Sequence, residues 1–410
     1  MRGGAATPLP RADLVVVGGG TIGGWAAHFA ADDGMSTLVV EQGVVGQGAS
    51  SRAAGMVRAQ AGTLAAEALG SWSIDFYSHQ AERLGTDSGF RALGYLLLAT
   101  RVSDVRPGRA RAAAQRARGL DVRWLEADEA VRAAPQLAVS GHRGGSYHAA
   151  DGCIDPVRNV RAYSLAMASS GVHLLERTEV VGLATESDGS GTRVVGVRTA
   201  GATIATSRVL LTGGPQLAEL GRRCGVRIPV GAVRHQVAVT EPHPAFQTGP
   251  QTMVYDMARG LYWREEEGGL LFGMSNPEER PGPAAAVDWA YLARMRRRLA
   301  RLVPVTQELR LRKVWAATID YTSDHLPILG PGLDARGRVI AGLTIAAPGG
   351  HGMMWGPAVA RAGADLALRG RTDVVDVSDL GLDRFDADQR SRLAGEPIAL
   401  PFPVRVPASS

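Results

Sequence analysis

The sequence contains little cysteine, little lysine and no long apolar run, and each shortage excludes a class of protein. No apolar run approaches the ~20 residues that a membrane-spanning helix needs, so we expect no membrane partner. Cys153 and Cys224 are the only cysteines in 410 residues, too few for a disulfide scaffold or a metal cluster. The first residues lack the apolar stretch of a secretory signal. We therefore expect a cytoplasmic protein without a metal site.

Lysine is almost absent, because Lys313 is the only one and arginine carries nearly all the positive charge. The formal net charge is +5, and arginines are densest in residues 106–118 and 294–301. Both segments have largely helical patterns, so we interpret these arginines as solvent-facing sides of helices. No aromatic residues are interleaved with them as in a nucleic-acid-binding surface. We expect no nucleic-acid partner.

The N-terminal part of the chain follows an ordered pattern of strand, glycine turn, helix and strand. Residues 13–17 are a short apolar run, and glycines at G-x-G-x-x-G spacing follow it. Residues 22–30 repeat apolar side chains at helical spacing. Residues 36–40 read as a second buried strand, which ends at the acidic Glu41. This pattern is typical of a unit that binds a dinucleotide.

Each special residue of this unit has a chemical reason. Gly18 allows the tight turn, Gly20 lets backbone N–H groups approach a pyrophosphate, and Gly23 lets the helix pack closely on the strand. Glu41 can accept hydrogen bonds from the hydroxyls of an adenosine ribose. A purely structural turn gives the same glycine spacing, but the agreement of all the parts favours dinucleotide binding.

Two other segments are rich in small residues. Residues 42–60 follow the second strand directly, and Ser50 and Ser51 can cap a short helix directed at phosphate. The alternative is an ordinary flexible loop, and the position of the segment favours the ligand. A second glycine turn at 347–352 precedes a helix predicted from Met353 to about Leu368. This turn also directs a helix N-terminus at a ligand.

The remaining pattern predicts an α/β fold. Helices are predicted at residues 64–84, 109–118 and 157–170, strands at 94–100, 173–183, 208–214 and 339–341, and a hairpin at 192–205. From residue 229 the strands become irregular, which suits a separate antiparallel sheet. In the basic segment before residue 302, Leu292, Met295, Leu299 and Leu302 form the predicted buried stripe.

Taken in order, these motifs resemble the D-amino-acid-oxidase-like flavoenzymes. The motifs are the turn from Gly18 with Glu41, then GQGASSRAAGMVR, YHAADGCIDP, VRHQVAVTEP, GLYWREEEGGLLFG, YTSDHLPILG and GGHGMMWGPAVAR. They span nearly everything from Asp13 to Phe385. Within that group the chain is most similar to the glycine/sarcosine oxidase and dimethylglycine dehydrogenase branch, which includes the β subunit of heterotetrameric sarcosine oxidases.

The resemblance implies a discontinuous Rossmann-like FAD-binding domain and a second, mainly antiparallel-sheet substrate domain. The implied ranges are 10–90, 146–228 and 324–388 for the first domain, 91–145 and 229–323 for the second, and 389–410 for a loosely ordered tail. The residues expected to bind FAD are Gly18, Gly20, Thr21, Ile22, Gly23, Glu41, Gln42, Ser50, Ser51, Arg52, Gly55, Met56, Val180, Gly213, Gly350, His351, Gly352 and Met353. We expect His351 to act through its backbone, its side chain being at least as readily a packed histidine.

Departures from the family pattern concern the flavin. Relatives that attach their flavin covalently use a cysteine at the position that Ala317 occupies here, or a histidine in the segment that matches residues 43–60. This sequence has neither residue there, so the resemblance implies non-covalent FAD. Leu271 replaces a lysine that promotes reaction with oxygen, which argues against a fast oxidase. Ser275 replaces a histidine of the amine site. The implied electron acceptor is O2 or another molecule.

The substrate site is implied in the same way. Arg58 matches one half of a carboxylate clamp, unless it pairs with a structural acid, and Met354 replaces the lysine of the other half. Tyr262 and Trp263 match pocket-lining aromatic positions, although either can be core of the sheet instead. With Met274 shaping an apolar wall, these residues are the expected catalytic set.

The expected protein is an FAD-dependent oxidoreductase that oxidises the C–N bond of a secondary or tertiary amino acid or related amine. A primary-amine oxidase for glycine or a D-amino acid, producing H2O2, is one alternative. An FAD-binding electron-transfer subunit of a sarcosine-oxidase-like complex is another, and either a homo-oligomer or a hetero-oligomer is compatible with the sequence. An NAD-dependent enzyme would leave the second glycine turn unexplained.

Overall fold

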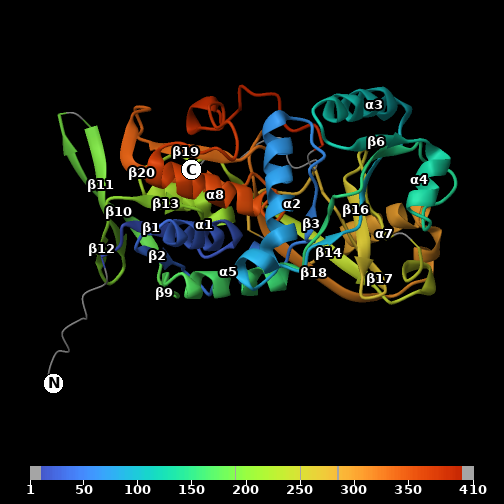
Figure 1. The fold of residues 1–410 in the computed structure, drawn as a ribbon, viewed down its shortest axis with the longest axis horizontal. Helices are drawn as coiled ribbons and strands as arrows, with labels where there is room; N and C mark the ends of the chain where they lie inside the picture. The colour runs from blue at the N-terminus through green and yellow to red at the C-terminus, as the bar shows by residue number, and fades with distance from the viewer. Residues whose placement is uncertain (1–10, 190, 250, 284–285, 399–410) are drawn as a thin grey trace, which may run out of the picture.

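The chain folds around two large sheets that lie side by side (Figure 1). The structure is a computed structural model that describes residues 11–189, 191–249, 251–283 and 286–398. In Figure 1 the first sheet lies with α1, α5 and α8 in one half of the picture, and the second lies with α3, α4 and α7 in the other. Helix α2 (Leu64–Leu84) lies between the two halves.

The first sheet is parallel at its centre. Its path is β10 (Val180–Asp188), β11 (Gly191–Thr199), β20 (Val339–Ala347), β13 (Val209–Leu211), β1 (Leu14–Val17), β2 (Thr37–Val40) and β9 (His173–Leu175), with β12 (Thr203–Ala205) paired to β11 and β19 (Ile328–Leu333) to β20. Strands β1, β2 and β13 are buried along their whole length. Their unbroken apolar runs are typical of parallel strands covered on both faces.

Helices α1 (Thr21–Asp32) and α8 (Gly356–Arg369) pack on this sheet and on each other, and α5 (Pro156–Ser169) packs on α1. Trp25 of α1 is fully buried, and its indole N–H donates to Asn159 of α5 at 3.1 Å. Asp155 caps α5, and Pro156 stands in its first turn. The predicted strand–turn–helix–strand unit is thus confirmed and covered by two further helices.

The second sheet is antiparallel except for the pairing of β5 with β15. Its path is β18 (Leu311–Tyr321), β14 (Gly231–Thr240), β17 (Gly269–Met274), β16 (Leu261–Glu266), β15 (Met253–Asp256), β5 (Tyr95–Leu98), β7 (Gly145–His148) and β6 (Val122–Leu125). Helix α7 (Trp289–Leu302) packs on it through the predicted apolar stripe. A small third sheet contains β3 (Met56–Val57), β8 (Gly152–Cys153) and β4 (Arg91–Ala92).

The other elements are short or peripheral: α3 (Val102–Ala117), α4 (Ala127–Ala133), α6 (Leu217–Arg223), and the 3-10 turns η1 (Ala49–Ser51), η2 (Gly214–Gln216), η3 (Pro244–Phe246), η4 (Pro304–Gln307) and η5 (Leu382–Arg384). Helix α3 begins seven residues before the predicted 109–118 helix, because the Asp104 carboxylate accepts the Arg101 backbone N–H at the start of the helix. The predicted strand 173–183 is divided between β9 and β10, which lie at opposite ends of the first sheet.

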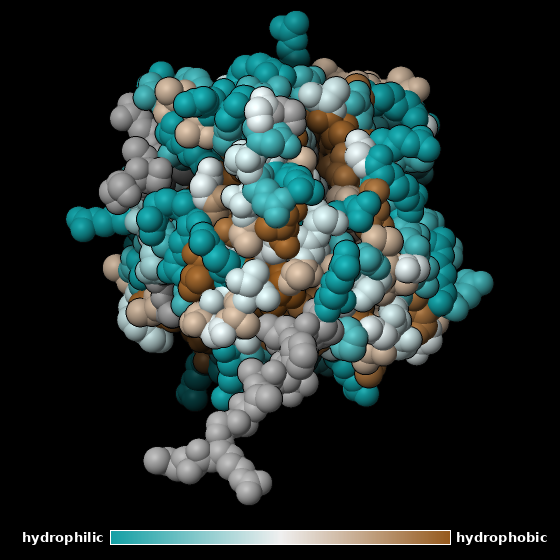
Figure 2. All heavy atoms as spheres, turned by 90° about the vertical axis from the view of Figure 1, so that its left-hand side faces the viewer, coloured by the Kyte–Doolittle hydropathy of each residue, from teal (hydrophilic) through white to brown (hydrophobic). Residues whose placement is uncertain are grey.

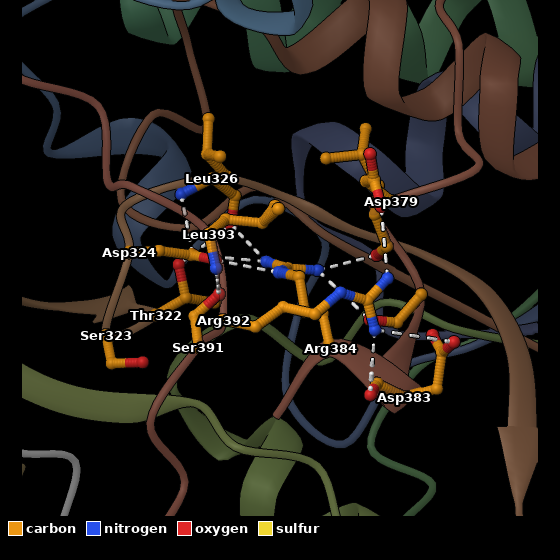
Figure 3. Close-up of polar contacts among 12 residues, drawn as sticks. Thr322, Ser323, Asp324, Leu326, Asp379, Asp383, Arg384, Ser391, Arg392 and Leu393 are labelled. Carbon is orange, nitrogen blue, oxygen red and sulfur yellow. Dashed lines mark hydrogen bonds and ion pairs between the residues drawn. The ribbon is translucent and has the colours of Figure 1, made fainter. Parts of the chain in front are cut away.

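Residues 380–398 are held by a buried ion pair. The Arg384 guanidinium donates to Asp324 at 2.7 Å, and their side chains are 0% and 1% exposed. Figure 3 shows the two side chains facing each other, with Arg392 directed at Asp379 and Asp383. Burial raises the pKa of Asp324, but the hydrogen bond and charge of Arg384 outweigh it and leave the pKa below its usual range.

The C-terminal residues differ from the loosely ordered tail expected from position 389. Gln389, Glu396 and Ile398 are all buried, because polar groups of other segments bind this stretch. Residues 399–410 lie outside the described part of the chain. Among the described residues, no helix is both long and apolar enough to cross a membrane. Polar side chains cover much of the face drawn in Figure 2.

The close contact of α1 with β1 gives a prediction for Gly23. A Cβ added at Gly23 would lie 1.8 Å from the carbonyl oxygen of Gly18, so Gly23→Ala must displace the turn. We expect a loss of roughly 2–4 kcal/mol in the free energy of unfolding, measured by chemical denaturation. Gly201→Ala is the control, since a Cβ there meets nothing within 4 Å. Equal free energies of unfolding for Gly23→Ala and Gly201→Ala would contradict the close packing of Gly23 against the turn.

Candidate functional site

A cavity of about 830 Å³ is lined by residues of both large sheets. Sites for small molecules commonly have volumes of ~300–1,000 Å³. Nineteen of the predicted site residues line it: Gly18, Gly20, Thr21, Ile22, Glu41, Gln42, Ser50, Arg52, Gly55, Met56, Arg58, Val180, Gly213, Tyr262, Gly350, His351, Gly352, Met353 and Met354. The four that do not are Gly23, Ser51, Trp263 and Met274.

The first glycine turn presents the N-terminus of α1 to the cavity. Gly18 has φ +109°, which glycine adopts without strain. Gly20 at the N-cap has no side chain that could cap the helix, and the Ser50 hydroxyl accepts the Thr21 N–H at 3.0 Å. Gly23 does not line the cavity, and its role is to let α1 pack closely against the Gly18 carbonyl. The open N–H groups and the helix dipole suit a phosphate.

Glu41 is fixed at the end of β2 by backbone groups. Its two carboxylate oxygens accept the N–H of Gly19 and the N–H of Gly43, each at 2.7 Å. Each carboxylate oxygen has a further lone pair. Because Glu41 lines the cavity and is not fully buried, it can accept ribose hydroxyls as the sequence predicts.

The second glycine turn reaches the same cavity. Gly349 and Gly350 have φ +62° and +98°. Helix α8 begins at Gly356 and not at the predicted Met353, because residues 352–355 form turns before it. His351 stacks on Trp355 with 4.0 Å between ring centroids. Burial and the charge of Arg58 hold the pKa of His351 well below its usual range, so its imidazole is neutral.

The two turns touch each other through side chains. The Thr21 hydroxyl lies 4.0 Å from the sulfur of Met353, and the Asn159 amide lies 3.6 Å from the same atom. The Tyr77 hydroxyl donates to the Met353 carbonyl at 3.0 Å. Two segments more than 300 residues apart in sequence therefore border one ligand site.

Arg58 is a buried cation at the other side of the cavity. It is 3% exposed and donates to the carbonyl oxygens of Gln60 and Ile398, the latter at 3.0 Å. Within the described ranges no carboxylate lies at ion-pair distance from its guanidinium, so the alternative of a core ion pair is not what the structure shows. A buried guanidinium with spare N–H donors is suited to binding a carboxylate.

Tyr262 and His235 form a hydrogen-bonded pair in the cavity wall. Their hydroxyl and Nε2 atoms lie 2.8 Å apart, and their rings are nearly parallel. Burial lowers the pKa of His235 to about 4, so this imidazole is neutral near pH 7. His235 was missed in the sequence, although VRHQVAVTEP was read as a strand and as a family motif. The available signal was its spacing of two residues from the buried Val233 and Val237, which places all three on one face of the strand.

Trp263 and Met274, which the resemblance assigned to the substrate pocket, do not line the cavity. Successive side chains of a strand point to opposite faces, so Trp263 points away from the face that Tyr262 occupies. Trp263 is fully buried in the cluster that packs on α7, and Met274 belongs to the same cluster. Both are core residues of the second sheet.

The positions that depart from the family pattern are also located. Ala317 lines the cavity, and Leu271 is buried in the apolar cluster that contains Tyr262. Ser275 is buried outside the cavity lining. Lys313 is 56% exposed and lies 3.6 Å from Glu267, so the single lysine of the chain is a surface residue.

Asp320, near the end of β18, supports the second turn and was also missed in the sequence. Its carboxylate accepts backbone N–H groups of Gly350 and Gly349. The residue is 6% exposed and lines the cavity, and its Oδ2 has no hydrogen-bond partner among the described residues. Burial raises the pKa of Asp320 to about 6, although the backbone hydrogen bonds oppose this.

These groups fit an FAD molecule. Two glycine turns offer backbone N–H groups where a bulkier residue would intrude, since a Cβ at Gly20 would approach the Ser50 hydroxyl to 3.2 Å. Glu41 offers acceptors for a ribose, and Val180 and Gly213 line the same cavity. Buried polar atoms generally have a hydrogen-bond partner. The unpartnered carboxylate oxygen of Asp320 therefore suits a hydrogen-bond donor of a bound ligand.

The raised pKa of Asp320 predicts how the stability of the apoprotein depends on pH. The folded protein binds this proton more tightly than the unfolded chain, whose carboxyl has a pKa of 3.8. Ionisation therefore costs free energy that appears between about pH 4 and 6, up to about 3 kcal/mol. Asp320→Asn should be more stable than the wild type at pH 7.5 but not at pH 4, measured by denaturation of both proteins. Glu82→Gln, on the exposed face of α2, is the control; the same pH dependence in Asp320→Asn and wild type would contradict this.

Comparison with known proteins identifies the family. The family model described as FAD dependent oxidoreductase (DAO) matches residues 13–366. Glycine oxidase from Geobacillus kaustophilus (strain HTA426) is 30% identical over 387 residues, covering 91% of this chain and 97% of the relative. A solved structure of glycine oxidase from Geobacillus kaustophilus aligns with a TM-score of 0.78 at 29% identity, over 92% of this chain and 99% of that one.

Two further proteins extend the comparison. 4-Methylaminobutanoate oxidase (formaldehyde-forming) from Paenarthrobacter nicotinovorans is 28% identical over 402 residues, which cover 94% of this chain and 47% of the relative, so the chain spans about half of that protein's length. L-Proline dehydrogenase from P. horikoshii aligns with a TM-score of 0.80 at 25% identity, over 90% of this chain and 96% of that one. The protein belongs to the DAO family and is an FAD-dependent oxidoreductase.

Proposed function

We propose that this enzyme oxidises the C–N bond of a secondary or tertiary amino acid, or of a related amine, to an imine or iminium that water hydrolyses. FAD, when bound, supplies the acceptor for the hydride that leaves the α-carbon. The observation that carries the proposal is Arg58, a buried cation without a carboxylate partner among the described residues, on the same cavity as both glycine turns.

The role of Arg58 follows from its free donors. A guanidinium has five N–H donors, and the carbonyl oxygens of Gln60 and Ile398 take two of them. A buried charge is costly unless it is paired and hydrogen-bonded. A substrate carboxylate offsets that cost and is held in a fixed orientation, which keeps the reacting C–H bond in place.

Tyr262 and His235 suit the amine end of the substrate. The neutral imidazole of His235 does not repel a cationic amine or the iminium product, and the Tyr262 ring can stabilise either through cation–π attraction. The substrate reacts as a neutral amine whose lone pair drives the loss of hydride. No strong base is therefore required of the chain.

Apolar residues complete the proposed substrate site. Met354 and Ala317 line the cavity, and the family resemblance implies a charged clamp residue and a tethering cysteine at these two positions. Half of the clamp thus remains, which favours a substrate that is larger or less dependent on its carboxylate. Two of the relatives are named for amino acids with a secondary amine, 4-methylaminobutanoate and L-proline, which supports this substrate class.

Arg58→Gln tests the carboxylate site. Losing a charge-assisted hydrogen bond worth about 1.5–3 kcal/mol should lower kcat/KM by roughly tenfold or more for a carboxylate substrate. The matched amine without the carboxylate should lose much less. The measurement is anaerobic bleaching of the flavin band with a panel of N-methyl and cyclic amino acids and their descarboxy analogues.

Two controls sharpen this test. Arg83→Gln, an exposed arginine on α2, should leave both rates unchanged. An equal loss on the acid and on its descarboxy analogue would assign Arg58 a purely structural role, and a panel on which the wild type bleaches no flavin would refute the proposed function.

The cavity also predicts how FAD is held. Ala317 offers no thiol, and neither Cys153 nor Cys224 lines the cavity, so we propose that FAD is bound without a covalent tether. Acid precipitation should release the yellow colour into the supernatant, measured by absorbance and by flavin fluorescence. Flavin retained in the washed pellet would overturn this.

A further inference from the structure

Residues 395–398 run from the buried Asp324–Arg384 pair to the substrate side of the cavity. Figure 3 shows Ser391 and Leu393 beside that pair, at the start of this path. The Glu396 N–H donates to the carbonyl of Asp324 at 2.9 Å. The ion pair therefore fixes the beginning of the segment. We call residues 395–398 the strap.

Glu396 fastens the strap to the start of α2. Its carboxylate accepts the N–H of Gly62 at 2.8 Å, the N–H of Thr63 at 3.1 Å and the Thr63 hydroxyl at 3.1 Å. Thr63 is the N-cap of α2, where a negative charge is favourable. Glu396 is 3% exposed, so the bonds are shielded from water. A buried carboxylate with this many donors is a strong anchor.

The strap also packs tightly against the loop it covers. A Cβ added at Gly62 would lie 2.1 Å from Cγ of Pro397, so the proline ring of the strap approaches this loop as closely as only a glycine permits. The strap has little freedom to shift while Glu396 is bound.

Ile398 brings the strap into the cavity. It is 3% exposed, lines the cavity and packs in the apolar cluster of Met56, Tyr95, Tyr255 and Tyr262. Its carbonyl oxygen accepts a hydrogen bond from Arg58 at 3.0 Å. The same residue thus supplies a wall of the site and orients its unpaired cation.

We propose that the strap determines substrate specificity. The Ile398 side chain limits the size of the amine's apolar substituent, the Ile398 carbonyl orients Arg58 toward the substrate carboxylate, and Glu396 is a positioning residue that holds both in place. This inference rests on the proposed function of the cavity. Within the proposed substrate class, the preferred amino acids are then those whose apolar N- or α-substituent fits beside Ile398.

Ile398→Ala tests the wall. Removing its methyl and methylene groups should favour large N-alkyl amino acids over N-methyl ones, raising the ratio of their kcat/KM values roughly tenfold, since one methylene changes discrimination by about 10–200-fold. Ile340→Ala, a buried isoleucine in β20 outside the cavity lining, is the matched control and should leave the ratio unchanged. An active Ile398→Ala with the wild-type ratio would overturn the proposal.

Glu396→Ala tests the anchor without any substrate. Hydrogen exchange at the amides of Gly62 and Thr63 should accelerate in this variant, and Glu396→Gln, which keeps an acceptor oxygen, should restore part of the protection. Equal exchange rates in all three proteins would refute the anchor. The wild type could show slow exchange at Gly62 and Thr63 and yet fail to bleach its flavin with any substrate of the panel. That result would refute the proposed function but not the attachment of the strap.

Discussion

The rest of the structure depends on how closely α1 packs against α8. A Cβ at Gly356 would lie 2.7 Å from Cγ2 of Thr21, and one at Gly363 would lie 2.9 Å from Cβ of Ala346. Glycine at these places lets the two helices and the first sheet approach until the N-terminus of α1 and the glycine turn before α8 border one cavity. The cavity is therefore bordered by backbone from both glycine turns, and the dipole of α1 acts at its phosphate side. Thr21 and Met353 are in contact only because of this packing.

The second sheet contributes through one of its two faces. Side chains that alternate along β14 and β16 either face the cavity side of the sheet or pack under α7. Tyr262 and His235 lie on the cavity side, and Trp263 lies on the other. A shift of one residue in strand register would exchange these sets. The antiparallel pairing, set over the eleven residues of β18, is therefore what selects the residues that meet a substrate.

Buried charge is distributed unequally around the molecule. Asp324 and Arg384 neutralise each other, and Glu396 is satisfied by backbone donors. Arg58 and Asp320 differ, because each lines the cavity with part of its hydrogen-bonding capacity unused. Such groups cost stability in the free protein and recover it when a ligand supplies the missing partner. The Asp324–Arg384 ion pair thus stabilises the fold, whereas Arg58 and Asp320 keep hydrogen-bonding capacity that a bound ligand can use.

The sequence by itself determined the elements whose signals are local. The first βαβ unit, helix α2 with its bounds and the apolar stripe of α7 follow from spacing along a few turns, and nineteen expected site residues line the cavity. Only the tertiary structure decided that Trp263 and Met274 are core, that His235 and Asp320 face the ligand, and that residues 389–398 are packed. These outcomes depend on which strand face meets which neighbour and on hydrogen bonds between residues hundreds of positions apart, such as Glu396 with Gly62. No local pattern encodes such contacts, because their energy exists only when the whole chain is folded.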